Sequence, residues 1–215
     1  MANVKICGIR RLEDALLAVD LGASALGFIF WPSGPRFIDP YRARPIVRAL
    51  PPFVTAVGVF VDQPWDFVAS VGRLLGLGAV QLHGNEAPET YARSPFRVIK
   101  GVSVASGEDA QRRVSGVPMT ATVLLDAHDP VKRGGTGKTI DWNDAAAIAQ
   151  TRPIILSGGL NADNVGTAIE TVKPYAIDVS SGVESSPGVK DAQKLRTLFD
   201  AVRVHAERAR ITAGR

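Results

Sequence analysis

The chain has 215 residues, 46% hydrophobic and 21% charged, which is the composition of an ordinary globular protein rather than a disordered one. A chain of this length buries about 70% of its unfolded surface, so it needs no disulfide or metal to hold a core. The single cysteine, Cys7, excludes an intramolecular disulfide and any multi-cysteine metal site. Cys7 is therefore either inert core or part of the chemistry.

The net charge is +4, and the basic residues are spread along the chain. Nucleic-acid binders more often cluster their basic residues. This favours small anionic ligands and predicts no nucleic-acid partner. The sequence indicates no function for the basic stretch from Arg203 to Arg215. The longest uncharged stretch, Leu21 to Pro35, has 15 residues and is broken by Gly and Pro, so no membrane span is predicted. The N-terminus has no apolar signal core, and we expect a cytoplasmic protein.

Short apolar runs alternate with helical patterns from one end of the chain to the other. Eight runs are predicted to be strands: Val4–Ile6, Ala25–Phe30, Thr55–Val61, Ala79–Leu82, Arg97–Lys100, Thr122–Leu125, Ile154–Leu156 and Ala176–Val179. Eight segments are predicted to be helices: Leu12–Asp20, Tyr41–Leu50, Trp65–Leu75, Ala87–Arg93, Glu108–Val114, Asn143–Ala149, Ala162–Val172 and Ala192–Arg208. We expect Gly22 to end the first helix and Asn161 to cap the seventh.

Continuous apolar strands are typical of a parallel sheet that is buried on both faces. Eight βα units in about 200 residues predict an α/β fold, a (β/α)8 TIM barrel that forms one domain over residues 1–215. The alternative is a doubly wound open sheet. No GxGxxG follows the first strand, and eight units favour closure into a barrel.

In such a barrel the active site lies at the C-terminal ends of the strands. Cys7 ends the first predicted strand and Asp126 follows the sixth. A thiolate can remove a proton and a carboxylic acid can deliver one, which is what an isomerase needs. Taken alone, a cysteine in an apolar strand is more often inert core, and an aspartate is more often a cap or an ion-pair partner.

Other polar residues near the strand ends are candidates for binding. Arg36, in a loop framed by Pro and Gly, can bind a carboxylate bidentately or can be solvated at the surface. Gln81 and His83 stand at the end of the fourth strand. His83 can act as a base or as a neutral hydrogen-bonded residue. The histidines and acids show no metal-ligand spacing, so no metal is predicted.

Glycine and serine recur after the last two strands, where phosphate-binding barrels place their site. Glycines let the backbone approach an anion, and the helix starts behind them point N–H groups at it. The alternative is that these residues only make tight turns. The recurrence in two consecutive units favours a phosphate, and the candidate residues are Gly158, Gly159, Ser180, Ser181 and Gly182.

Five strings stand in order at barrel spacing from Lys5 onward. Together they resemble the phosphoribosylanthranilate isomerase family of tryptophan biosynthesis, over nearly the whole chain to about Arg196. The combination of the first and last strings is the most specific. They are Lys5-Ile6-Cys7-Gly8, Gln81-Leu82-His83-Gly84, Gly134-Gly135-Thr136-Gly137, Ser157-Gly158-Gly159-Leu160 and Asp178-Val179-Ser180-Ser181-Gly182-Val183-Glu184.

The resemblance implies a cofactor-free Amadori rearrangement of phosphoribosylanthranilate to the carboxyphenylamino ribulose phosphate. It implies that Asp126 is the general acid that opens the furanose ring and that Cys7 is the general base at C2′. Arg36 would hold the anthranilate carboxylate, and the backbone around Gly158, Gly159, Ser181 and Gly182 would hold the phosphate. We expect the partner to be a small phosphorylated substrate and the enzyme to be a monomer or a homodimer.

Three readings compete at this point. The histidine-pathway isomerase of the analogous ribosyl substrate, and a bifunctional relative, are both expected to use an acidic residue where Cys7 stands. A barrel that only binds a phosphorylated metabolite would not need Cys7, Asp126 and Arg36 together.

The segment Ala127–Thr139, rich in glycine, is the best candidate for a loop that closes over substrate.

Overall fold

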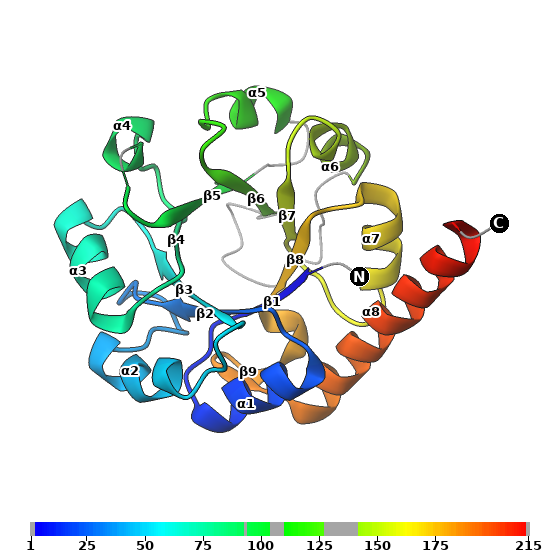
Figure 1. Ribbon diagram of the computed structural model, residues 1–215, viewed down its shortest axis with the longest axis horizontal. Helices are drawn as coiled ribbons and strands as arrows, with labels where there is room; N and C mark the ends of the chain where they lie inside the picture. Colours follow the sequence, from blue (N-terminus) through cyan, green and yellow to red (C-terminus); the bar gives the residue numbers. More distant parts are fainter. Residues whose placement is uncertain (1–2, 93, 104–109, 127–141, 214–215) are drawn as a thin grey trace.

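The computed structural model describes residues 3–92, 94–103, 110–126 and 142–213, and the side chains as far as residue 205. Eight parallel strands form a closed barrel in the order β1-β2-β3-β4-β5-β6-β7-β8, and helices surround it (Figure 1). The barrel closes because β8 pairs with β1 as well as with β7. The prediction of a (β/α)8 barrel is therefore confirmed, and the open sheet is wrong.

The strands are short and the helices that follow them vary in length. The barrel strands are β1 (Asn3–Cys7), β2 (Ala25–Ile29), β3 (Thr55–Phe60), β4 (Ala79–Leu82), β5 (Arg97–Ser103), β6 (Thr122–Asp126), β7 (Ile154–Ser157) and β8 (Ala176–Val179). The helices are α1 (Leu12–Leu21), α2 (Pro40–Arg48), α3 (Trp65–Leu75), α4 (Pro88–Tyr91), α5 (Ala110–Ser115), α6 (Trp142–Ala149), α7 (Val165–Val172) and α8 (Ala192–Ala213). After β8 come a 3-10 turn η1 (Ser181–Val183) and a small hairpin, β9 (Glu184–Ser186) and β10 (Val189–Lys190).

The sequence places most elements within a few residues of their positions in the structure. The strand prediction stops short where β1, β6 and β7 continue to Cys7, Asp126 and Ser157, because a polar or thiol side chain ends each apolar run. Gly22 ends α1 with φ 112°, in the left-handed region that favours glycine, as predicted.

The expected cap at Asn161 is wrong. Helix α7 begins later, at Val165, and its N-cap residue Asn164 makes no side-chain capping hydrogen bond. The side chain of Asn161 instead accepts the N–H groups of Asp163 and Asn164 in the turn before the helix. A short polar side chain satisfies local backbone donors equally well in a turn, so the residue type alone did not fix the helix start.

Two apolar layers make the core, because successive strand residues point to opposite faces. One layer lies between the barrel and the helices and includes Ile6, Leu26, Val80 and Leu125. The second fills the barrel interior as a small cluster: Val57, Ala79, Ile99, Leu124, Ile155 and Ala176. The interior cluster closes the barrel beneath the strand ends, so polar residues further along the same strands face a mouth that is closed at its base.

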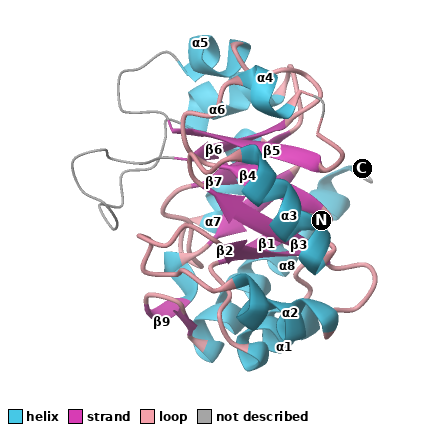
Figure 2. Ribbon diagram, turned by 90° about the vertical axis from the view of Figure 1, so that its left-hand side faces the viewer, coloured by secondary structure: helices cyan, strands magenta, loops and turns pink. Residues whose placement is uncertain are grey.

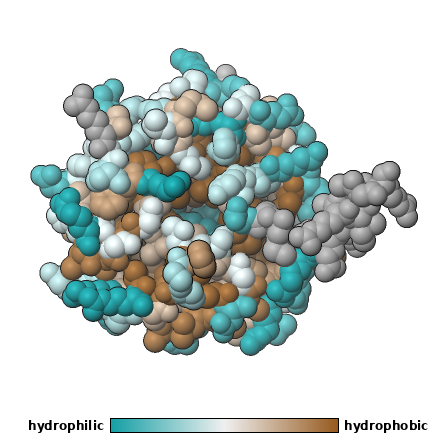
Figure 3. Space-filling view, in the orientation of Figure 1, coloured by the Kyte–Doolittle hydropathy of each residue, from teal (hydrophilic) through white to brown (hydrophobic). Residues whose placement is uncertain are grey.

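The mouth lies at the end of the barrel opposite the N-terminus. In Figure 2 the β9 hairpin that follows β8 is on the left and the N-terminus on the right, so the strands run toward the left-hand face. The opposite face, seen in Figure 3, carries apolar residues around its middle and hydrophilic residues toward its rim. Among the residues described, no helix is both long and apolar enough to cross a membrane.

Candidate active site

Polar side chains occupy the barrel interior just beyond its apolar cluster. They come from inward-facing positions of β1, β4, β6 and β8, each two residues from another inward-facing position on its strand. The most buried of them are exposed by 6% or less: Lys5, Cys7, Gln81 and Asp178. Polar groups that are buried together at one end of an apolar barrel mark a site, since burial without partners is costly.

Cys7 ends β1 beside a buried ion pair. Lys5 Nζ lies 2.8 Å from Asp178 Oδ1, and both side chains are nearly inaccessible to solvent. A Cβ placed on Gly27 of β2 would come within 2.7 Å of Cys7 Sγ and 3.1 Å of Lys5 Nζ. Both atoms therefore lie over Gly27, and the missing side chain of this glycine makes room for them.

The charges around Cys7 oppose each other. Burial raises the pKa of the Cys7 thiol, and Asp178 raises it further, while Lys5 and Lys190 lower it without cancelling the rise. Burial alone would lower the pKa of Lys5, but Asp178 and Cys7 raise it overall, so Lys5 keeps its proton. Two ammonium groups thus face a thiol that burial keeps protonated.

Asp126 ends β6 and joins a chain of polar side chains. Its Oδ2 lies 3.2 Å from His83 Nε2, and His83 Nδ1 lies 3.1 Å from Gln81 Nε2. Ser103 and Ser157 are its register neighbours on β5 and β7. Asp126 is partly exposed, with 19% of its side chain accessible, so it borders both the buried chain and the open mouth.

Arg36 is held at the mouth by an acid of its own chain. Its Nε lies 2.9 Å from Glu184 Oε1, and its Nη2 lies 2.7 Å from Glu184 Oε2. Lys190 Nζ contacts the same carboxylate at 2.9 Å. A Cβ on Gly8 would meet Arg36 Cδ at 2.7 Å, so the stem of Arg36 passes directly beside the residue after Cys7.

The pairing of Arg36 with Glu184 leaves one side of the guanidinium available. Burial alone would raise the pKa of Glu184, but hydrogen bonds from Arg36 and Lys190 lower it overall, so the acid is charged. Nε and one N–H of Nη2 face this carboxylate. Nη1 of Arg36 has no partner among the described residues, and an arginine has enough donors to bind a second carboxylate from that side.

The loops after β7 and β8 meet at a second corner of the mouth. Gly158 and Gly159 have φ values of 94° and 63°, which side chains rarely tolerate. A Cβ on Gly182 would overlap the carbonyl of Leu160, so the two loops touch backbone to backbone. The N–H groups of Gly158 and Gly159 donate to no backbone carbonyl of the described residues, which leaves them available to an anion.

The structure brings the predicted residues together in three groups. Gln81, His83 and Asp126 form one chain, and Gly158, Gly159 and Gly182 form the loop corner. Ser180 links the loop corner to β1, because its Oγ donates to the Cys7 carbonyl at 3.2 Å. Cys7 and Asp126 end strands β1 and β6, on different sides of the same mouth.

Four charged residues of the site escaped the sequence prediction: Lys5, Asp178, Glu184 and Lys190. A signal was present for the first two, since a charged residue inside an otherwise apolar strand needs a buried partner. Position 5 also shares the face of position 7, by strand alternation. The predicted closing segment Ala127–Thr139 lies outside the described residues, and so does the whole string Gly134-Gly135-Thr136-Gly137 within it.

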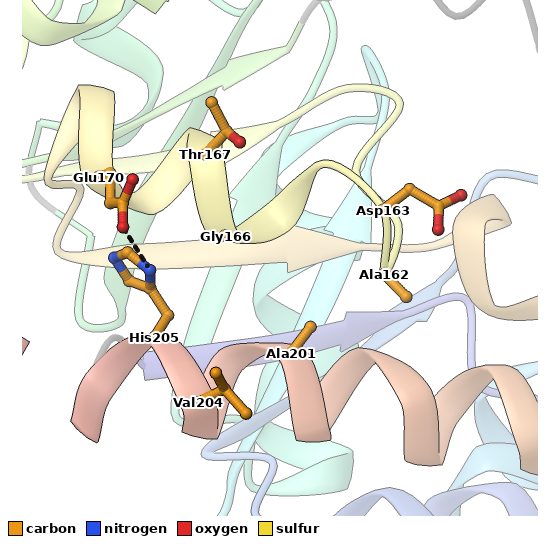
Figure 4. Close-up of a pocket in the computed structure, with 8 residues that line it drawn as sticks. All are labelled: Ala162, Asp163, Gly166, Thr167, Glu170, Ala201, Val204 and His205. Atoms are coloured by element: carbon orange, nitrogen blue, oxygen red, sulfur yellow. Dashed lines mark ion pairs between the residues drawn. The ribbon is translucent and has the colours of Figure 1, made fainter. Parts of the chain in front are cut away.

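A groove on the flank of the barrel is a second hollow, separate from the barrel mouth. It lies between α7 and α8, where Glu170 Oε1 pairs with His205 Nδ1 at 3.0 Å (Figure 4). None of the inward-facing polar residues of the barrel lines it. Within the described ranges, no group of three or more His, Cys, Asp or Glu is arranged to bind a metal.

Comparison with known proteins gives a consistent result over nearly the whole chain. The family profile described as N-(5'phosphoribosyl)anthranilate (PRA) isomerase matches residues 4–201. An N-(5'-phosphoribosyl)anthranilate isomerase of Geobacter sulfurreducens is 50% identical over 201 residues, which cover 93% of this chain and 97% of the relative.

Solved structures with the same description are also similar. Phosphoribosyl anthranilate isomerase from Thermotoga maritima has a TM-score of 0.89 and 43% identity, covering 95% of this chain and 100% of that one. A second structure, in complex with reduced 1-(o-carboxyphenylamino)-1-deoxyribulose 5-phosphate, has a TM-score of 0.85 and 40% identity, with the same coverage of both chains.

Proposed function

Since the chain belongs to the N-(5'-phosphoribosyl)anthranilate isomerase family, we propose that Cys7, Asp126 and Arg36 carry its chemistry. The chain is an isomerase of tryptophan biosynthesis that converts N-(5'-phosphoribosyl)anthranilate by an Amadori rearrangement. The product is the carboxyphenylamino deoxyribulose phosphate. What the proposal adds is the assignment of each step to a residue of this chain.

Asp126 is the general acid of the first step. Its carboxyl group gives a proton to the furanose ring oxygen while the anthranilate nitrogen pushes electrons toward C1′. The bond between C1′ and the ring oxygen breaks, and a protonated Schiff base forms. The position of Asp126 supports this role, because it ends β6 at the mouth and is partly exposed there.

Cys7 is the general base of the second step. As a thiolate it removes the proton from C2′, and the electron pair left behind flows into the Schiff base to give an enolamine. The enolamine then tautomerises to the ketone. Lys5 and Lys190 support this role, because both favour the thiolate and partly offset the burial that raises the pKa of the thiol.

The two ends of the substrate have separate binding groups. The free side of the Arg36 guanidinium binds the anthranilate carboxylate, and Glu184 and Gly8 fix the arginine for this. The N–H groups around Gly158, Gly159, Ser181 and Gly182 bind the phosphate at the contact between the two loops. Metal and cofactor have no part in the proposed steps.

The observation that carries the proposal is the placement of Cys7 and Asp126. They occupy inward-facing positions at the carboxyl ends of β1 and β6. The histidine-pathway reading would need an acidic residue at position 7, and this chain has a thiol. We further propose that the chain forms one domain, acts in the cytoplasm, and works as a monomer or homodimer, which sedimentation would distinguish.

The test uses purified protein and freshly prepared phosphoribosylanthranilate, whose loss is followed by fluorescence. Cys7→Ala and Asp126→Asn are each expected to abolish turnover while the far-UV spectrum and unfolding midpoint stay near those of the parent. Near-full activity in either variant would refute that residue's role. The histidine-pathway substrate is run beside it, and equal turnover of both substrates would refute the specificity.

A further inference from the structure

His83 and Gln81 form a chain of side chains that ends on the proposed acid. The chain runs from Gln81 Nε2 to His83 Nδ1 at 3.1 Å and from His83 Nε2 to Asp126 Oδ2 at 3.2 Å. The mechanism above uses the final member of the chain only. The other two residues are inward-facing on or just after β4, so the chain crosses the mouth from β4 to β6.

The surroundings hold the His83 ring in one place. Its backbone N–H donates to the Phe60 carbonyl at 2.8 Å. A Cβ on Gly101 of β5 would overlap the ring, so that glycine provides the space the imidazole occupies. Lys100 Nζ donates to the carbonyls of Leu82 and Gly84, which flank His83 on both sides. The position of the ring is therefore fixed from the two neighbouring strands, β3 and β5.

The amide of Gln81 decides which ring nitrogen of His83 carries the hydrogen. With Nε2 of the amide toward the ring, Nδ1 accepts a hydrogen bond and the neutral imidazole carries its hydrogen on Nε2. That N–H then points at Asp126 Oδ2. In the opposite amide orientation the ring would carry its hydrogen on Nδ1, and two acceptors would face each other at 3.2 Å.

Gln81 keeps this orientation although one of its atoms is left without a partner. Gln81 is 2% exposed, and its Oε1 is buried without a hydrogen bond among the described residues. A buried acceptor left unpaired is unfavourable by about 1–3 kcal/mol, and native proteins retain such groups rarely. The unpaired Oε1 indicates that the hydrogen bond to His83 determines the orientation of the Gln81 amide.

We propose that Gln81 and His83 are positioning residues for Asp126. The amide fixes the Nε2–H form of His83, and that N–H engages Oδ2 of the carboxyl group. Oδ1, which has no partner among the described residues, is left to carry the proton and give it to the ring oxygen. Only this proton moves, and the carboxylate that remains keeps its hydrogen bond from His83. The inference rests on the proposed function of Asp126.

Other charged groups near the chain have partners of their own. Lys100 of β5 pairs with Glu86 at 3.0 Å, and the Glu86 carboxylate also accepts the N–H of Asp62 at 2.9 Å. Asp62, after β3, accepts the N–H of Asn85 at 2.6 Å. Among the described residues, Asp126 is the carboxylate that pairs with the His83 imidazole.

The first test reads the tautomer directly. The protein has three histidines, so 15N-histidine labelling gives a small set of signals, which single substitutions assign to residues. We expect the parent protein at neutral pH to show His83 with hydrogen on Nε2 only. Gln81→Glu, which offers only acceptors, should move hydrogen onto Nδ1. A parent protein with hydrogen on Nδ1 alone would overturn the proposal.

The second test separates hydrogen bonding from mere packing. Gln carries an N–H at about the distance that His Nε2 has from the backbone, so His83→Gln can still engage Oδ2. We expect His83→Gln to keep kcat within several-fold of the parent, while His83→Leu and Gln81→Met lose about 10- to 100-fold in kcat with little change in KM. Equal losses of kcat in His83→Gln and His83→Leu, or no loss of kcat in Gln81→Met, would contradict the positioning role.

The matched control is His205→Gln, a histidine in the outer groove that pairs with Glu170 and should leave kcat unchanged. Asp126→Asn distinguishes the two levels of failure. If Asp126→Asn keeps its activity, the proposed function fails. If it is inactive while His83→Leu is fully active, only the positioning role fails.

Discussion

Lys5 and Asp178 occupy paired positions on β1 and β8, and their charged atoms lie 2.8 Å apart inside the barrel. Both are nearly inaccessible to solvent, and Cys7 lies on the same face of β1 as Lys5, one inward position further on. The pair closes the barrel at the seam between its first and last strands. It also puts a fixed positive charge beside the proposed base.

The base should govern the pH dependence of the reaction. Burial raises the pKa of the Cys7 thiol, so the thiolate fraction at neutral pH is small and grows as pH rises. We expect kcat/KM to increase with pH through the neutral and mildly alkaline range. The rate of Cys7 alkylation by iodoacetamide should rise over the same range, because the thiolate is the nucleophile. A flat profile for both would contradict the role of Cys7.

Removing the cation should move that pH dependence. In Lys5→Met the thiolate loses its nearest positive charge, so the rise in kcat/KM and in alkylation should shift to higher pH. Because Lys5→Met strands a buried Asp178 and could destabilise the fold by about 3–5 kcal/mol, the double variant with Asp178→Asn is measured too. Lys100→Met, another buried lysine that pairs with an acid, is the control and should leave the position of the rise unchanged.

Arg36 should act on substrate binding more than on stability. We expect Arg36→Ala to raise KM by about 10- to 100-fold, since it removes charge-assisted hydrogen bonds to a carboxylate. Steady-state kinetics and urea unfolding measure the two effects. The control is Arg10→Ala, an exposed arginine of the same region whose guanidinium donates to the Pro35 carbonyl. An unchanged KM for Arg36→Ala would refute the assignment.

Glu184 should stabilise the protein in a pH-dependent way. Hydrogen bonds from Arg36 and Lys190 outweigh burial and lower its pKa in the folded state. Its contribution is therefore present above the ordinary pKa of a glutamate and is lost as pH falls through that value toward the folded one. Glu184→Gln should reduce the free energy of unfolding by about 3–5 kcal/mol at pH near 7.

The same variant should differ less from the parent near pH 4, where the Glu184 carboxylate of the unfolded chain begins to protonate while that of the folded protein, with its lowered pKa, does so at lower pH. Urea unfolding at both pH values measures this. A difference that is equal at both values would show that Glu184 acts through packing rather than through charge.

Gly182 should be needed for phosphate binding. In Gly182→Ala the new methyl group meets the Leu160 carbonyl, so one of the two loops must shift. We expect a higher KM and weaker competitive inhibition by inorganic phosphate, with kcat affected less. Gly116→Ala is the control, because a Cβ there meets nothing closer than 3.9 Å. Unchanged inhibition by phosphate in Gly182→Ala would contradict the phosphate site.

The local pattern of the sequence predicted the barrel and the strand-end residues. Strands buried on both faces must be apolar throughout, and eight such runs with helices between them leave few architectures. The rule that the active site of such a barrel lies at the carboxyl ends of its strands then selected Cys7, Asp126, Gln81 and His83. The glycines after β7 and β8 predicted the loop corner, and at Gly158 few other residues permit a φ value of 94°.

Only the tertiary structure decided which of these residues act together. Glu184 is 148 positions from Arg36, and Asp178 is 173 positions from Lys5, so no local pattern links either pair. Closure of the barrel brings β8 against β1 and thereby creates both the ion pair behind Cys7 and the hairpin that holds Arg36. The chain from Gln81 to Asp126 likewise depends on strand register across β4, β5 and β6, which the sequence does not encode locally.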